Sequence, residues 1–261
     1  LEEYGIKAGL TPVKIEALPY PVSPLLGEKL SPSDYDFRLA QLSMSSGNEI
    51  NIAVPISGAA IGMEYINKLI DLLHEKSSDF QFHVVAQTVP FTLFFLNKIK
   101  HYPYVSLYTS RHSRETVDLY DVLYQKEIIS MEITKPSEQA FKALLRTDQR
   151  GGSVLLFTKP VGRQEYDNLN FLRRHGLLFS QQERDMLWKK SAAGQSIGDY
   201  GIVKLFDGKA KIRGIEIPYE AVEASRFIWW CLKYGILEKI AEHGNFDSSE
   251  KVIETRSDGV S

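Results

Sequence analysis

Two polar clusters in the middle of the chain could bind an anion or a nucleotide. Residues 134–139 follow the apolar run 128–133, and residues 162–168 follow the run 154–160. In an open parallel sheet, ligands bind outside the carboxyl ends of the strands. The N-terminus of a helix that begins there offers free N–H groups and a positive dipole end. The sequence therefore predicts that the two clusters meet at one site.

The first cluster has residues suited to a diphosphate. Pro136 is tolerated in the first turn of a helix, and Ser137 is a good cap for the N–H groups of that turn. N–H groups around Ser137, Glu138 and Gln139 could hold a diphosphate, and Lys135 would add positive charge. The carboxylate of Glu138 must turn away from such a ligand, since unit charges about 4 Å apart repel by roughly 4 kcal/mol at intermediate dielectric.

Two earlier turns are further candidates. Gly58 and Ala59 follow the apolar run 49–57, where small residues let the backbone approach a phosphate or simply close a tight turn. Arg111 and His112 follow the predicted strand 104–109, where they could stack on a ring or meet a phosphate. A solvated polar turn is the alternative interpretation for this second pair.

The two clusters also carry a family resemblance. The patterns ITKPxxxAFxAL, from residue 133, and VLLFxKPVxxQExxNxxFL, from residue 154, extend over about a third of the chain together with their surroundings. They resemble the UDP-sugar-binding half of the GT-B glycosyltransferases that include diacylglycerol glucosyltransferases, galactolipid synthases and MurG-type enzymes. The resemblance implies a donor site without a metal or other cofactor. It implies that Arg111 lies near the nucleobase, that Gln164 and Glu165 meet sugar hydroxyls, and that Asn168 braces their loop.

The resemblance also implies a protein with more than this chain. In such two-domain transferases the acceptor site and a catalytic base lie in an N-terminal half, so this chain alone is expected to be inactive. That missing half would be the part that contacts a membrane. No catalytic residue is assigned here. An alternative interpretation of Gln164 and Glu165 is that they only complement the dipole of the helix they begin.

The chain departs from the family pattern at two places. Ser137 and Glu138 replace a pair of small residues, and Ala143 replaces the acidic residue that holds the ribose hydroxyls. These changes support a second hypothesis, in which the fold is a non-catalytic binding or interaction module that has lost donor binding. A third hypothesis is an unrelated nucleotide-binding α/β protein.

Composition narrows the class of protein. The net charge of −2 over 261 residues gives no overall signal for nucleic acid, and the single cysteine, Cys231, suits a reducing compartment. The six histidines have no metal-ligand spacing, so no metal site is expected. The sequence shows no signal peptide and no apolar run near 20 residues. We therefore expect a cytoplasmic protein, with peripheral membrane contact left open.

Strands alternate with helices through much of the chain, which predicts a Rossmann-like, doubly wound parallel sheet. Residues 1–47 are expected to be an interdomain linker and the start of the domain, mainly extended with short helical pieces. Residues 48–180 are expected to form the nucleotide-sugar-binding domain. Residues 181–261 are expected to pack on it as helices, a hairpin around Asp207 and Gly208, and one long helix over 218–242.

Overall fold

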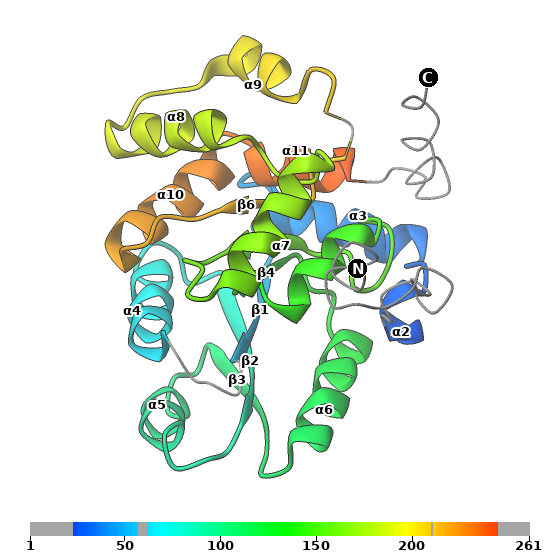
Figure 1. Cartoon of the computed structure of the whole chain (residues 1–261), viewed down its shortest axis with the longest axis vertical. Helices are drawn as coiled ribbons and strands as arrows, with labels where there is room; N and C mark the ends of the chain where they lie inside the picture. Colours follow the sequence, from blue (N-terminus) through cyan, green and yellow to red (C-terminus); the bar gives the residue numbers. More distant parts are fainter. Residues whose placement is uncertain (1–22, 57–61, 210, 245–261) are drawn as a thin grey trace, which may run out of the picture.

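The computed structural model describes residues 23–56, 62–209 and 211–244 of the chain (Figure 1). Six parallel strands form one sheet in the order β3-β2-β1-β4-β5-β6. The strands are β1 (Ile50–Ile56), β2 (Phe80–Gln87), β3 (Val105–Ser110), β4 (Met131–Thr134), β5 (Val154–Phe157) and β6 (Gly214–Glu216). The fold is α/β and Rossmann-like, as the alternating pattern predicted.

Helices cover both faces of the sheet, as a parallel sheet requires. In Figure 1, α4 and α10 lie on one side of the strands and α6 lies on the other. The helices are α2 (Pro24–Gly27), α3 (Pro32–Leu42), α4 (Met63–His74), α5 (Leu93–Ile99), α6 (Ser113–Lys126), the 3-10 helix η2 (Glu138–Leu144), α7 (Arg163–Arg174), α8 (Gln181–Ala192), α9 (Gly198–Phe206), α10 (Ala221–Lys233) and α11 (Ile236–His243).

Side chains alternate between the two faces along each buried strand. On β1, Ile52 and Val54 join the core shared with α4, α10 and α11, whereas Ala53 packs toward α6. On β5, Val154 and Leu156 join that same core, whereas Leu155 packs with η2 and α7. Because both faces are buried, these strands read as continuous apolar runs in the sequence.

The order of the strands reverses between β1 and β4. The chain moves outward through β1, β2 and β3, and then returns to the middle of the sheet to add β4, β5 and β6 on the other side. Ligand sites of doubly wound sheets lie at such a reversal, because the two adjacent loops leave in opposite directions and open a crevice. The reversal thus lies at the carboxyl ends of β1 and β4, next to the β4 and β5 pair at which the sequence predicted a site.

The predicted hairpin is wrong. Residues 198–206 form α9, and Gly208 adopts a left-handed conformation with φ +67° just after this helix. The Asp-Gly pair thus marks the end of a helix, where glycine is as common as in a hairpin turn. The following segment supplies β6, which pairs in parallel with β5 and extends the main sheet.

The predicted single helix over 218–242 is also wrong. Gly235 has φ +67° and separates α10 from α11, since a left-handed residue cannot continue a right-handed helix.

The expected α-helix start at Pro136 and Ser137 is a 3-10 helix, and the Ser137 side chain makes no cap hydrogen bond. Residues 32–42 form an 11-residue helix rather than a short piece, with Ser31 Oγ accepting from Asp34 N at 3.1 Å.

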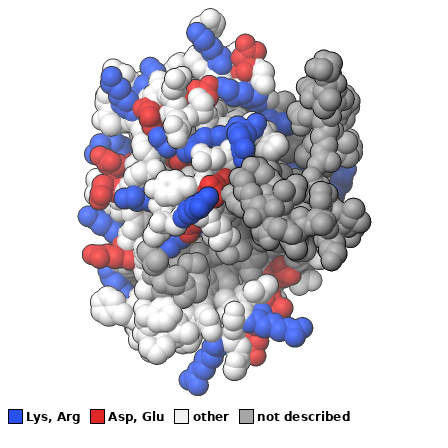
Figure 2. Space-filling model, in the orientation of Figure 1, with Lys and Arg blue, Asp and Glu red and all other residues white. Residues whose placement is uncertain are grey.

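The face of the molecule in Figure 2 mixes lysine and arginine with aspartate and glutamate, in keeping with the small net charge. Apolar side chains are exposed on the segment that leads from β2 into α5. Phe91, Leu93 and Phe94 are 55%, 44% and 83% exposed. They follow the carboxyl end of β2.

Candidate functional site

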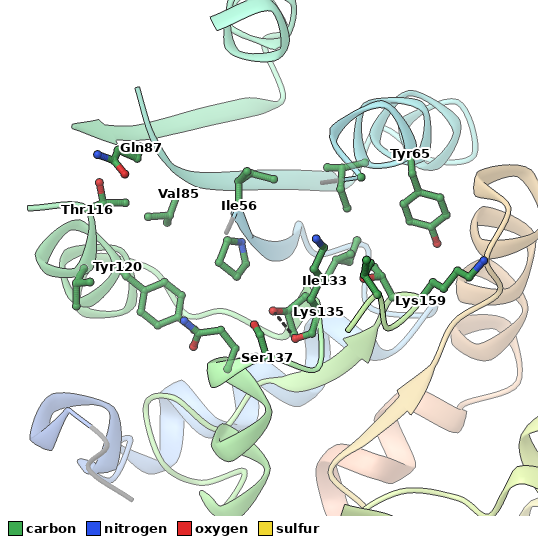
Figure 3. Close-up of a pocket in the computed structure, with 18 of the residues that line it drawn as sticks. Ile56, Tyr65, Val85, Gln87, Thr116, Tyr120, Ile133, Lys135, Ser137 and Lys159 are labelled. Carbon is green, nitrogen blue, oxygen red and sulfur yellow. Dashed lines mark hydrogen bonds between the residues drawn. The ribbon is translucent and has the colours of Figure 1, made fainter. Parts of the chain in front are cut away.

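A cavity of about 590 Å³ lies at the carboxyl edge of the sheet, where the strand order reverses. The ends of β1, β2, β4 and β5 form its floor, and α4 and α6 form opposite walls. Figure 3 shows Gln87, Thr116 and Tyr120 at one end of this cavity and Lys159 and Tyr65 at the other, with Lys135 between them. The cavity adjoins the first of the two predicted clusters, the one that follows β4.

Two lysines bring positive charge to the cavity. Lys135 directly follows β4, and Lys159 comes two residues after β5. Lys135 is half-buried, and burial lowers its pKa, an effect that the Glu165 carboxylate partly offsets. Lys159 is exposed, with Nζ 5.5 Å from the centre of the Tyr219 ring. Since β4 and β5 pair in parallel, the lysines leave the sheet at the same edge.

Hydroxyl and amide groups complete the lining. Thr158 is buried, and its N–H donates to Thr134 O at 2.9 Å, which continues the pairing of β4 and β5 past the strand ends. At the other end, Gln87 Nε2 donates to Arg111 O at 2.9 Å. This bond ties the turn after β3 to the end of β2.

The turn from β4 into η2 is held by Asn168 of α7. Asn168 Nδ2 donates to Pro136 O at 2.9 Å and to Ser137 O at 3.1 Å. Two carbonyl groups that would otherwise be left at the turn are thereby paired. The sequence led us to expect Asn168 to brace the loop of Gln164 and Glu165, but its side chain instead holds the turn that carries Lys135 and Ser137.

The predicted site residues separate into three groups in the structure. Lys135, Ser137 and Gln139 line the cavity. Gln164 is exposed and Glu165 Oε2 accepts from Val161 N at 2.6 Å, and neither side chain lines the cavity. Arg111 is exposed and also lies outside the lining.

The third group is not described. Gly58, Ala59 and the side chain of Glu138 lie outside the part of the molecule that the structure describes. Ala143, at the position where the resemblance has an acidic residue, is fully buried and packs with Leu155, Phe157 and α7. A carboxylate at this position would face the core rather than the cavity.

Several lining residues were not predicted: Tyr65, Gln87, Thr116, Tyr120, Thr158, Lys159 and Tyr219. A signal existed for Lys159, because the Lys-Pro pair after β4 recurs after β5 at Lys159 and Pro160. No sequence signal connects Tyr219 to this edge, since it comes from the segment after β6, far along the chain. Tyr65 OH donates to Pro218 O at 2.8 Å, and burial raises its pKa.

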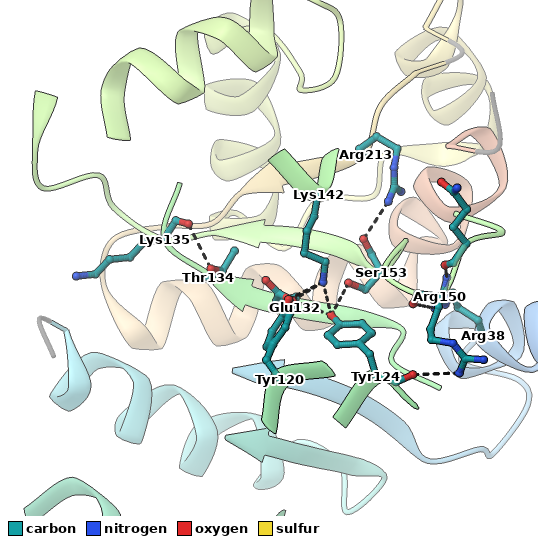
Figure 4. A network of polar contacts seen from close by, with 11 residues as sticks. Arg38, Tyr120, Tyr124, Glu132, Thr134, Lys135, Lys142, Arg150, Ser153 and Arg213 are labelled. Carbon is teal, nitrogen blue, oxygen red and sulfur yellow. Dashed lines mark hydrogen bonds and ion pairs between the residues drawn. The ribbon is translucent and has the colours of Figure 1, made fainter. Parts of the chain in front are cut away.

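A buried polar network lies behind Tyr120 (Figure 4). Glu132 Oε2 accepts from Lys142 Nζ at 2.6 Å, from Tyr120 OH at 2.5 Å and from Tyr124 OH at 2.7 Å. Tyr124 OH also lies 3.0 Å from Ser153 Oγ. Tyr120 is the member of this network that also lines the cavity.

The described residues contain neither a metal-binding cluster nor a membrane-spanning helix. Over the residues that the structure describes, no three His, Cys, Asp or Glu side chains are grouped so that they could hold a metal ion. Within the same residues, no helix has the length and apolar character needed to span a bilayer.

Comparisons with known proteins find a similarity to solved structures and none to known families. No known family matches the sequence, and no curated protein matches it. The crystal structure of the Anabaena protein HepE in complex with UDP and glucose superposes on 95% of this chain, with 13% sequence identity and a TM-score of 0.45. The superposed part is 57% of the HepE chain, so this chain spans little more than half of that protein.

Proposed function

We propose that the cavity binds a nucleotide sugar, with the diphosphate against Lys135 and Lys159, and that the chain is the donor-binding part of a GT-B glycosyltransferase. The observation that supports this most is the placement of two lysines at adjacent strand ends beside a neutral, partly apolar chamber. A volume of about 590 Å³ lies within the range of small-molecule sites. The motifs after β4 and β5 agree with this proposal.

The lining suggests how such a ligand would be oriented. The two ammonium groups lie toward the β4 and β5 ends, where they would offset the charge of the diphosphate. The far end, near Gln87 and Thr116, offers an amide and a hydroxyl that suit the edge of a base. The sugar would extend toward the open mouth of the cavity, where an acceptor could approach.

The chemistry would be transfer of the sugar from the diphosphate to an acceptor. The bond between the anomeric carbon and the diphosphate oxygen breaks, and the diphosphate leaves with added negative charge. The acceptor oxygen forms the new bond to the anomeric carbon and gives its proton to a base outside this chain. Lys135 and Lys159 would stabilise that charge as it develops, which is the usual contribution of fixed cations to such a step. We assign no catalytic base to this chain and expect none of its residues to complete transfer alone.

Calorimetric titration with UDP tests the proposal. We expect saturable binding, and we expect Lys135→Ala and Lys159→Ala each to weaken it about 10-fold, the usual value of a charge-assisted hydrogen bond. Lys126→Ala is the matched control, because Lys126 is exposed at the C-terminal end of α6 and does not line the cavity. The proposal fails if millimolar UDP gives no heat, or if all three variants bind UDP alike.

A second function is favoured by the burial of Ala143 and by the position of Gln164 outside the cavity. Without an acidic group at residue 143 and with Gln164 exposed, contacts to ribose and sugar would be fewer than the resemblance implies. The chain would then bind a nucleotide without discriminating between sugars. Equal affinity for UDP, UDP-glucose and UDP-galactose would support this function, whereas a preference for one UDP-sugar over UDP itself would support the donor role.

A further inference from the structure

Tyr120 connects the cavity to a buried ion pair. It lies on the α6 wall, is 7% exposed and lines the cavity at the end opposite Lys159. Its hydroxyl points the other way, into the core, where it donates to Glu132 Oε2 and accepts from Lys142 Nζ at 2.7 Å. The position of this part of the wall therefore depends on groups that never reach the ligand.

The network joins β4, η2 and α6 to the segment just before β5. Glu132 comes from β4, Lys142 from η2, Tyr120 and Tyr124 from α6, and Ser153 from the residue before β5. Lys142 Nζ has three N–H donors, and they match three acceptors: Glu132 Oε2 at 2.6 Å, Tyr120 OH at 2.7 Å and Tyr124 OH at 2.5 Å. Every proton of the ammonium group is used, so the arrangement is complete only while Lys142 is charged.

A buried ion pair is an expensive way to fill a core. Removing two charges from water costs free energy, and apolar residues of similar volume are often at least as stabilising. Glu132 is fully buried and Lys142 is 3% exposed, and both lie next to the wall of the cavity. What such a pair provides is a fixed geometry for the groups that it bonds, and here one of those groups is Tyr120.

We propose that Glu132 and Lys142 are positioning residues that fix Tyr120 as the wall against which the base of the nucleotide lies, and that base recognition weakens when Lys142 loses its proton. This inference rests on the proposed function. The base is assigned to this end because Lys159 lies at the other end of the cavity and Lys135 lies between the two ends (Figure 3). A neutral amine has one donor fewer than its three acceptors need, and it leaves the Glu132 carboxylate without a counter-charge.

The surroundings of Lys142 set the pH range of this effect. Burial lowers the pKa of Lys142 to about 8, and Glu132 acts in the opposite direction. The titratable and charged groups that act on Lys142, from α3, α6, β4 and the segment before β6, are Arg38, Tyr120, Tyr124, Glu132 and Arg213. The two arginines favour proton loss. We therefore expect the change between pH 7 and pH 9.5.

The test compares two ligands, UDP and inorganic pyrophosphate, so that effects at the base end are separated from effects at the phosphate end. The measured quantity is the affinity for UDP divided by the affinity for pyrophosphate. In the unmodified chain we expect the ratio to fall several-fold from pH 7 to pH 9.5. In the uncharged variant E132Q/K142M we expect the ratio at pH 7 to be about 10-fold lower than in the unmodified chain, because one or two hydrogen bonds are lost. We also expect this ratio to change less with pH than that of the unmodified chain.

Two further variants keep the test decisive. Tyr120→Phe removes only the anchoring hydroxyl and should lower the ratio even if E132Q/K142M does not fold. Lys209→Met, which removes an ion-paired lysine outside the cavity lining, should leave the ratio and its pH profile unchanged. Any pH effect of the ligands themselves is common to all proteins and cancels in the comparison.

The outcomes separate the two proposals. If neither UDP nor pyrophosphate binds, the proposed function fails and this inference fails with it. If both bind and Tyr120→Phe has the same ratio and pH profile as the unmodified chain, this inference alone is overturned. A lower ratio in Tyr120→Phe, with unchanged affinity for pyrophosphate, supports it.

Discussion

Replacing His83 should make the fold less sensitive to acid. His83 lies on β2, is buried, and its Nε2 lies 3.0 Å from Asn51 Oδ1. Because that oxygen only accepts, Nε2 carries the proton of the neutral ring. The other ring nitrogen, Nδ1, is buried without a partner. Protonation would therefore place an unpaired N–H and a charge in the core at the same time.

The magnitude follows from the pKa of the ring. Burial lowers the pKa of His83 from 6.5 to about 4. The unfolded chain thus takes up its proton first as the pH falls, and the contribution of this ring to stability is lost between pH 6.5 and pH 4. A difference of about 2.5 pH units, at roughly 1.36 kcal/mol each, corresponds to about 3 kcal/mol.

Urea unfolding at several values between pH 7 and pH 4.5 measures this loss. His83→Gln keeps an N–H donor toward Asn51 but does not titrate in this range, so its free energy of unfolding should fall less than that of the unmodified chain. His101→Gln is the control, because His101 is exposed. Carboxylates titrate in all three proteins and cancel in the difference. Parallel curves for His83→Gln and the unmodified chain would refute the reasoning.

Three other substitutions test the local structure. Gly214→Ala should lower the free energy of unfolding in denaturant by about 2 kcal/mol or more, because an ideal Cβ at this position would lie 2.5 Å from a carbonyl oxygen of β5. Gly162→Ala should cost little, because the space around Gly162 is open. Similar losses in the two variants would contradict the β5–β6 pairing. Ser180→Ala should lower the free energy of unfolding by about 1 kcal/mol, since it removes the capping box of α8, and a loss near zero would count against that cap. Asn168→Ala should weaken UDP binding several-fold in calorimetry by releasing the turn that carries Lys135, and unchanged affinity would show that the brace is dispensable.

The sheet was predictable because its strands are buried on both faces. The predicted strand 104–109 differs from β3 by one residue at each end, and the apolar run 49–57 contains the whole of β1. The strand β6 lies within the segment predicted as the second strand of the hairpin, but its partner is β5 and not the segment before Asp207. The Asp-Gly signal at 207–208 was misread because glycine with positive φ ends a helix as readily as it turns a hairpin.

The site was partly predictable for a similar reason. Lys135, Ser137 and Gln139 follow a recognisable strand, and the carboxyl end of that strand fixes where they lie. Gln164 lies further from the end of β5 than Lys135, Ser137 and Gln139 lie from the end of β4. The sequence does not determine the direction in which the side chains of the first turn of α7 point. Gln87 and Tyr219 depend on strand order and on a distant segment, which only the folded chain brings to the cavity.

The packing of α10 on α4 has a consequence for how the molecule is made. One of these helices begins at residue 63 and the other at residue 221, yet they contact each other directly over one face of the sheet. During synthesis, the apolar face of α4 cannot be covered by α10 until the ribosome has added the residues of α10. Contacts between such distant segments slow folding and leave apolar surface open in the meantime. Early release of a truncated chain would therefore favour aggregation over a smaller working fold.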